Sequence, residues 1–323
     1  MSNYMAIVHN SIKENTKVGC DLYLKSRVNG AIRYVLFCRG DEIYCDKQKK
    51  QIIEQNIEKL FISAKDYEKY FRYQEKNLQD ILTDKQRSAE EKSHMVYNTA
   101  KYLVQDLLSD PRSGLNTKVK RASKWVDNTV NYILSDKEAF PSLLKVTTHD
   151  YYTYTHSVDI SVLALLFGRH VHLDIHSLKC LGVGGLLHDL GKVEIPLDIL
   201  NKPGKLTKDE FEIVKKHPEI GMEFLKGKAD IHEKSLEVVI QHHENYDGTG
   251  YPNRIGGNDI HLFGRISRII DVYDAITTNR CYRRALTPYD ALVEMSENME
   301  NCFEKELFKE FVCFLGPHSQ REK

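Results

Sequence analysis

The segment Gln241–Pro252, with the sequence QHHENYDGTGYP, is the most informative part of this chain. It joins two adjacent histidines, His242 and His243, to an acidic, glycine-rich loop that ends in Gly-Tyr-Pro. Neighbouring residues on a helix point about 100° apart, so adjacent imidazoles more easily serve two metal ions, or one ion from a frayed helix end. The pair therefore favours a metal cluster over a closed tetrahedral zinc site.

Two further motifs contain the other ligand types. His188 and Asp189 open the motif His-Asp-Leu-Gly-Lys, at the end of a segment with a helical pattern, and Asp271 and Asp274 lie in a later helical segment. Neutral imidazole binds divalent transition metals, and a carboxylate can bridge two of them. Together the motifs supply nitrogen and carboxylate ligands for more than one metal ion.

The second half of the chain has a helical pattern. From about residue 149 onward, apolar residues recur at steps of three and four, which predicts an all-helical unit. Glycine and proline interrupt this pattern in two predicted loops, 191–206 and 244–262. The predicted helices span residues 156–170, 177–190, 208–226, 231–242, 264–279, 288–299 and 303–314.

Residues 1–85 have a mixed pattern of predicted strands and helices, which indicates a small α/β domain. Its expected role is regulation or interaction. Residues 18–24 and 32–38 are predicted strands, and Asn29-Gly30 between them suits a tight hairpin turn. Further predictions are a helix through Ile53, Ile57 and Leu60, a short strand at 61–62, and a helix rich in aromatic residues that Ser63 caps.

Residues 86–148 are interpreted as a helical connector, with helices at 87–108 and 116–135 separated by a segment containing Pro111 and Gly114. This connector is also a candidate homodimer seam. Residues 317–323 form a polar tail. The predicted fold class is α+β overall, with a mixed N-terminal domain, the connector and an all-α domain at 149–316.

Composition narrows the choice of function. Lys+Arg and Asp+Glu total 46 each, so the chain has no electrostatic signature of binding to duplex nucleic acid, although a small anionic ligand remains compatible. No apolar run reaches the ~20 residues of a membrane helix, and the N-terminus lacks a signal-peptide layout. The seven cysteines are scattered without a Cys-x-x-Cys pair, which is typical of reduced thiols in a cytoplasmic protein.

The three motifs and their order resemble the HD-GYP family, whose best-known members hydrolyse cyclic di-GMP. The resemblance covers roughly residues 149–316 and implies two divalent metal ions, most often iron or manganese. It assigns His156, His188, Asp189 and Asp271 to one ion. It assigns bridging Asp189 together with His217, His242 and His243 to the other.

Further roles are expected around this centre. Asp189 and Lys192 are the predicted catalytic residues, with the Lys192 ammonium as a point charge for a phosphate oxygen. The loop residues Gly250, Tyr251 and Pro252 are expected to contact substrate or a protein partner, or else to brace the histidine helix. Arg283 is the predicted arginine contact to phosphate or a guanine edge. Asp274, one turn after Asp271, is expected to orient a ligand histidine or to make a hydrogen bond on the helix face.

One position departs from the family. Members with three metal ions have a glutamate four residues before the first histidine ligand, and here that position is Tyr152. A phenol loses its proton only near pH ~10, so it is a poor substitute for a carboxylate. The sequence therefore predicts a two-metal centre. Other histidines, including His170, His172 and His176, are interpreted as surface or core residues.

The resemblance implies a phosphodiesterase that linearises cyclic di-GMP to pGpG, with further cleavage to GMP left open. Three alternatives remain: hydrolysis of another cyclic dinucleotide such as cyclic GMP-AMP, a non-enzymatic cyclic di-GMP receptor or scaffold, and a general HD phosphohydrolase acting on mononucleotides. A protein partner would bind through the N-terminal domain or the Gly-Tyr-Pro loop.

Overall fold

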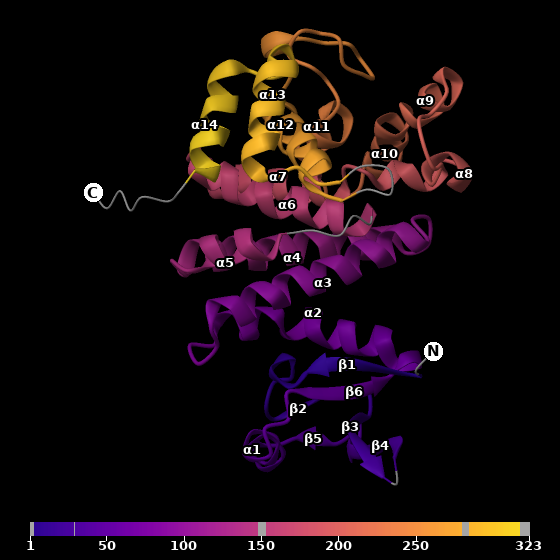
Figure 1. The fold of residues 1–323 in the computed structure, drawn as a ribbon, viewed down its shortest axis with the longest axis vertical. Helices are drawn as coiled ribbons and strands as arrows, with labels where there is room; N and C mark the ends of the chain where they lie inside the picture. The colour runs from indigo at the N-terminus through magenta and orange to yellow at the C-terminus, as the bar shows by residue number, and fades with distance from the viewer. Residues whose placement is uncertain (1–2, 29, 148–152, 280–283, 317–323) are drawn as a thin grey trace. The chain divides into compact units, whose positions relative to one another are not determined.

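The computed structural model of the chain describes residues 3–28, 30–147, 153–279 and 284–316 (Figure 1). The chain is mostly helical, with a small antiparallel sheet near the N-terminus, as expected for the α+β class. It divides into two compact units, residues 1–99 and 100–323. This division falls within α3 (Ala89–Ser109), inside the segment interpreted as a connector. Among the described helices, none combines the length and apolar character needed to cross a bilayer.

The first unit is built on a four-stranded sheet in which each neighbouring pair is antiparallel. Leu22, Leu60 and Ile62 are fully buried in its core. A second, two-stranded sheet pairs β2 (Thr16–Lys17) with β5 (Ile43–Tyr44). The strand order of the larger sheet is β1 (Tyr4–Val8), β6 (Lys59–Ser63), β3 (Leu22–Val28) and β4 (Ala31–Cys38).

The predicted hairpin is present, because β3 and β4 pair with Val28 opposite Ala31. Asn29 in the turn lies outside the described residues. The first predicted strand starts too early: Val18 and Cys20 are buried, but β3 begins at Leu22. Burial of alternate residues before a strand therefore reflects a packed loop that leads into the sheet.

Two helical predictions in this unit are wrong. Helix α1 (Asp46–Glu54) ends before Ile57, and Leu60 belongs to β6. Leu60 is in a strand because β6 pairs with β1, and this pairing outweighs the weak local helical pattern. Ser63 also does not cap the aromatic helix α2 (Tyr67–Thr83), since a short 3₁₀ turn intervenes and Asp66 occupies the N-cap position.

The second unit consists of helices, most of which match the predicted spans. The exception is 208–226, which forms two helices separated at Lys215 and Lys216. Pro218 lies in the first turn of the second, where its missing N–H costs no hydrogen bond. The helices are α4 (Leu115–Ser135), α5 (Ala139–Val146), α6 (Thr153–His170), α7 (Ile175–Leu187), α8 (Leu197–Leu200), α9 (Lys208–Val214), α10 (His217–Leu225), α11 (Glu233–Gln241), α12 (Leu262–Thr277), α13 (Pro288–Asn298) and α14 (Lys305–Leu315).

Helix α7 is the central element of this unit, because every residue from Ser177 to Leu187 is buried or half-buried and the helix packs against α4, α6 and α11. Glycines allow two of these neighbours to approach closely. A Cβ on Gly184 would lie 2.7 Å from the carbonyl oxygen of Ser235 in α11, and one on Gly185 would lie 3.1 Å from the Cα of Ser161 in α6. The absence of side chains at these positions thus sets the spacing of three helices that carry candidate ligands.

The loop after α7 makes a similarly close contact. Leu190–Glu194 forms a 3₁₀ helix that packs on α10. A Cβ on Gly191 would lie only 2.0 Å from the carbonyl oxygen of His217 and 2.6 Å from the backbone nitrogen of Gly221. Only glycine fits there, so this contact holds the start of α10 beside the end of α7.

We expect Gly191→Ala to lower the free energy of unfolding by at least about 1–3 kcal/mol, because the clash is with backbone, which a rotamer change cannot relieve. Urea denaturation of the metal-free protein measures this change. Gly316→Ala is the matched control, since its Cβ would be no closer than 3.4 Å to any atom outside its chain neighbours. Equal denaturation midpoints for the two variants would contradict the assigned packing.

Candidate metal centre

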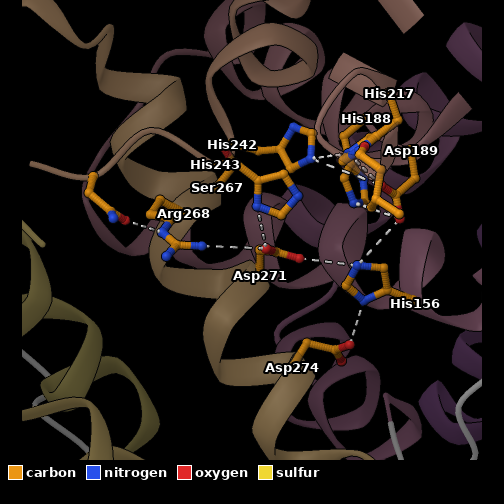
Figure 2. Close-up of polar contacts among 12 residues, drawn as sticks. His156, His188, Asp189, His217, His242, His243, Ser267, Arg268, Asp271 and Asp274 are labelled. Carbon is orange, nitrogen blue, oxygen red and sulfur yellow. Dashed lines mark hydrogen bonds and ion pairs between the residues drawn. The ribbon is translucent and has the colours of Figure 1, made fainter. Parts of the chain in front are cut away.

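The predicted metal ligands converge in one cluster within the second unit (Figure 2). Each comes from a helix or a helix end: α6, the C-terminal ends of α7 and α11, the first residue of α10, and the middle of α12. The seven side chains are His156, His188, Asp189, His217, His242, His243 and Asp271.

Asp189 lies between two groups of histidines. Its Oδ2 is 3.4 Å from the Nε2 of His188 and 3.7 Å from that of His156. Its Oδ1 is 3.3 Å from the Nε2 of His217 and 3.9 Å from that of His242. Each carboxylate oxygen therefore faces a different histidine pair, which is the arrangement a bridging carboxylate requires.

Asp271 is the second carboxylate of the cluster. Its Oδ1 is 3.2 Å from His156 Nε2, and its Oδ2 is 3.6 Å from His243 Nδ1. The potential ligand atoms form three overlapping sets, each within 4.8 Å: His156, His188 and Asp271; His217, His242 and His243; and His188, Asp189 and His242. The third set joins Asp189 to one histidine from each of the other two. The geometry thus offers two neighbouring positions for a cation, with Asp189 between them.

Hydrogen bonds orient four of the imidazoles. The Nδ1 atoms of His188, His217 and His242 lie 2.8, 2.8 and 2.9 Å from the carbonyl oxygens of residues 185, 214 and 239, respectively. Donation from Nδ1 to a carbonyl leaves the Nε2 lone pair facing the cluster. The Nδ1 of His156 instead lies 2.6 Å from Asp274 Oδ2, so Asp274 contacts a predicted ligand histidine.

The donor set fits a metal ion on a direct structural criterion. His188 Nε2 and Asp189 Oδ1 are buried and have no hydrogen-bond partner within the described structure. Buried polar atoms nearly always have a hydrogen-bond partner, so two atoms without one in the same cluster indicate that a bound group is their partner. Imidazole nitrogens with carboxylate oxygens suit iron, manganese or zinc.

Protonation states also match the needs of a metal site. Burial opposes the charge on Asp189, but neighbouring His188 and Lys192 hold its pKa well below the usual range. Burial lowers the pKa of His217 to about 4 and holds the pKa of His242 well below its usual value. Ionised carboxylates and neutral imidazoles are the forms that bind divalent cations.

Lys192 lies at the edge of this cluster. Its Nζ donates to Asp189 Oδ2 over 2.6 Å, and its side chain is 18% exposed. The ammonium therefore reaches both the central carboxylate and solvent, which is compatible with a contact to an incoming anion.

The Gly-Tyr-Pro loop folds back on His243. The Tyr251 ring stacks on the His243 ring with centroids 4.6 Å apart, and the Tyr251 N–H donates to the His243 carbonyl over 3.2 Å. A Cβ on Gly250 would lie 2.3 Å from the backbone nitrogen of Asn245, so only glycine fits. Pro252 follows and is half-buried. These contacts favour the bracing interpretation of the loop.

Sequence reasoning missed two charged residues here. Arg268, three residues before Asp271, has an Nη1 4.0 Å from the Asp271 carboxylate, and its Nε donates to Asn245 over 2.9 Å (Figure 2). The i, i+3 spacing on α12 was the available signal. Glu244 is buried and accepts from the backbone N–H of residue 253 over 2.6 Å, which anchors the loop. Of the predicted residues, Arg283 and Tyr152 lie outside the described residues.

A family model described as HD domain matches residues 128–307. A cyclic di-GMP phosphodiesterase of Pseudomonas aeruginosa is 36% identical over 222 residues, which is 69% of this chain and 53% of that protein. A 3'3'-cGAMP-specific phosphodiesterase 2 of Vibrio cholerae is 43% identical over 122 residues, 38% of this chain and 23% of that protein. The chain thus spans about half or less of these relatives.

Among solved structures, an HDG"Y"P protein from Bdellovibrio bacteriovorus has a TM-score of 0.66 with this chain. The match covers 97% of this chain and 100% of that chain at 17% sequence identity. At this identity the likeness concerns the fold.

We expect the metal-free protein to lose stability as the pH falls from about 6.5 toward about 4. The unfolded chain binds protons at its histidines near pH ~6.5, whereas folded His217 stays neutral down to about pH 4. His217 alone accounts for a loss on the order of 3 kcal/mol over this range. Urea denaturation of chelator-treated protein across this range measures the slope.

His217→Gln should flatten that slope, and His172→Gln, at an exposed position, is the control that should retain it. Stability that is constant between pH 6.5 and pH 4 would show that the imidazoles of the cluster are not held neutral.

Proposed function

The chain belongs to the HD-domain family, and on this premise we propose that it hydrolyses cyclic di-GMP to linear pGpG, with two divalent metal ions. The observation that carries the proposal is the position of buried Asp189 between two histidine sets, one toward each carboxylate oxygen. The similarity to a Pseudomonas aeruginosa protein named as a cyclic di-GMP phosphodiesterase supports this substrate.

We assign one ion to His156, His188, Asp189 and Asp271, and the other to Asp189, His217, His242 and His243. Iron and manganese are the proposed metals, because the resemblance to the HD-GYP family implies them and the nitrogen and oxygen donors are compatible with both. When bound, two such ions activate water for attack and neutralise charge on the phosphoryl group.

The protein's own residues orient the ligands and the substrate. Backbone carbonyls and Asp274 contact the Nδ1 atoms of four histidines, which directs each Nε2 toward the cluster. Lys192 and Arg268, both only partly exposed, are the described cations placed to hold phosphate oxygens. Tyr251 keeps His243 in position by stacking, and it offers an aromatic ring beside the cluster.

The remaining assignments extend this proposal to the whole chain. Residues 149–316 form the phosphodiesterase domain, 86–148 the connector with a homodimer seam, 1–85 a regulatory or interaction domain, and 317–323 a tail. A protein partner would bind the N-terminal domain or the Gly-Tyr-Pro loop. A cytoplasmic location is proposed because the seven cysteines are scattered without a Cys-x-x-Cys pair.

Cyclic GMP-AMP is the second candidate substrate, because the chain is also 43% identical over 122 residues to a Vibrio cholerae phosphodiesterase named as specific for 3'3'-cGAMP. Competition between the two nucleotides for one enzyme preparation, followed by chromatography, separates these substrates. Faster consumption of cyclic GMP-AMP at equal concentrations would replace cyclic di-GMP in the proposal.

Asp189→Ala should abolish turnover, because it removes the carboxylate shared by both ions. Manganese-loaded wild-type protein is expected to contain two ions per chain and to release pGpG, measured by metal analysis and chromatography under anaerobic conditions. The variant should lose more than about 100-fold in rate, since even outer residues of metal sites cost 10–100-fold.

Asp198→Ala is the matched control, because Asp198 is an exposed aspartate of α8. A normal rate in Asp189→Ala would exclude the assigned cluster. Wild-type protein that holds two ions and binds cyclic di-GMP without turnover would favour the receptor alternative instead.

Lys192→Ala should keep two ions per chain but lower kcat by about 100-fold, because it removes a charge placed for the phosphoryl group. Metal analysis and kcat are measured on the same preparations. Lys202→Ala is the control, because Lys202 lies in the loop before α9 and pairs with Glu210 of that helix. Loss of metal in Lys192→Ala would assign Lys192 to the support of Asp189 rather than to the reaction.

A further inference from the structure

A second group of metal-ligand side chains lies in the same unit, at the other ends of α7 and α11. His176 and Cys180 come from the first turns of α7, and His232 is the N-cap residue of α11. One ligand atom from each lies within 4.8 Å of the others. The Cys180 Sγ is 3.6 Å from His176 Nε2, and the rings of His176 and His232 have centroids 4.6 Å apart.

We propose that His176, Cys180 and His232 bind a divalent transition metal ion of the zinc class, separate from the cluster at Asp189. Two imidazoles and a thiolate are a ligand set that zinc uses in tetrahedral sites, with water in the fourth position. Zn–S and Zn–N bonds at a tetrahedral angle separate sulfur from nitrogen by about 3.6 Å. The Cys180–His176 distance already has this value.

The backbone explains why these side chains meet. His176 and Cys180 are four residues apart on α7, so they share one face of the helix. The close contact of Gly184 with Ser235 fixes α11 against that face, which brings His232 beside the pair. The donors are thus held by two packed helices rather than by a loop, and little ordering is needed for an ion to bind.

The local charges both help and oppose a cation. Asp174, the N-cap residue of α7, contributes a carboxylate beside the site, and its pKa is lowered by hydrogen bonds from Ser177. Lys234 is the opposing charge. Burial raises the pKa of the Cys180 thiol, and the nearby Lys234 ammonium offsets only part of this increase. The metal-free thiol is therefore protonated at neutral pH, and an ion that binds to it releases this proton.

His232 must also change its hydrogen bonding. Its Nδ1 accepts from the backbone N–H of Lys234 over 3.2 Å, so in the metal-free chain the ring proton is on Nε2. Metal binding through either nitrogen replaces this contact. His176 and His232 are exposed, which gives an ion and its water access from solvent, whereas Cys180 is buried.

The position of this site differs from that of the Asp189 cluster. His176 precedes His188 by twelve residues along α7, a separation of roughly 18 Å at the rise of an α-helix. An ion here would link the N-terminal ends of the two helices whose C-terminal ends hold His188, Asp189 and His242. Binding to it is independent of the reaction proposed at Asp189.

Cobalt(II) titration of the full-length, metal-free protein tests the proposal, because a thiolate bound to cobalt gives a charge-transfer band that nitrogen and oxygen ligands cannot produce. The Asp189 cluster contains no cysteine, so the band reports the second site alone. We expect the band in the wild type and in the control Cys313→Ser, which removes an exposed thiol elsewhere. It should be absent from Cys180→Ser.

His176→Gln keeps the thiol and changes only an exposed residue, so a folding defect is not expected. It should weaken cobalt affinity by on the order of 100-fold, since removal of a ligand costs at least as much as removal of an outer residue. Zinc should displace cobalt and remove the band. Circular dichroism confirms that each variant is folded.

No charge-transfer band in the wild type at saturating cobalt would overturn the proposal, as would a band that persists in Cys180→Ser. Unchanged cobalt affinity in folded His176→Gln would also contradict it, because the thiol would then bind without its helical neighbour. Failure of turnover at Asp189 has no bearing on any of these outcomes.

Discussion

The burial of one carboxylate, Asp189, is the constraint on which the second unit depends. The side chain is 1% exposed, and a charge in such a place is tolerated only when other groups compensate it. Lys192 and four imidazoles surround it. His188 and Lys192 are close to Asp189 in the sequence, whereas His156, His217 and His242 come from other helices or helix ends. Residues from α6, α10 and α11 must therefore pack around the end of α7 before the site exists, so the ligand set and the fold of this unit are specified together.

Glycine provides the close packing that this arrangement needs. Gly184 and Gly185 let α11 and α6 approach α7, and Gly191 lets the following loop touch the backbone of α10 at His217. A side chain at any of these positions would clash with backbone atoms of a neighbouring element, and such a clash is relieved only by moving that element. Small shifts of these helices would also separate the two orphaned atoms, His188 Nε2 and Asp189 Oδ1, from the positions that face a shared cation. Packing at a distance from the ligands thus controls their geometry.

Part of the ligand cluster could be predicted from compact motifs, because His188-Asp189 and His242-His243 mark the ends of α7 and α11. The other ligands, His156 and His217 above all, are assigned through the resemblance to the HD-GYP family. Other features depended on tertiary contacts. Leu60 joins a strand because β1 is available as its partner, and the helix at 208–226 breaks where Pro218 starts a new one. Arg268 belongs to the site because it contacts Asn245 and Asp271. These two residues lie in separate sequence segments, so the sequence pattern did not show that Arg268 joins them.

The second ligand group, His176, Cys180 and His232, also could not be predicted from the sequence. His176 and Cys180 have the spacing of neighbours on a helix, but the third donor, His232, lies on α11 and becomes relevant only when the two helices are aligned. That alignment is parallel, since His176 meets His232 at one end of the pair while His188 meets His242 at the other. Two parallel helices in close contact bring together residues at matching heights along their length. The packing at Gly184 that positions the Asp189 cluster therefore also positions the donors of the second site, and an ion there would add a cross-link to the same helix pair.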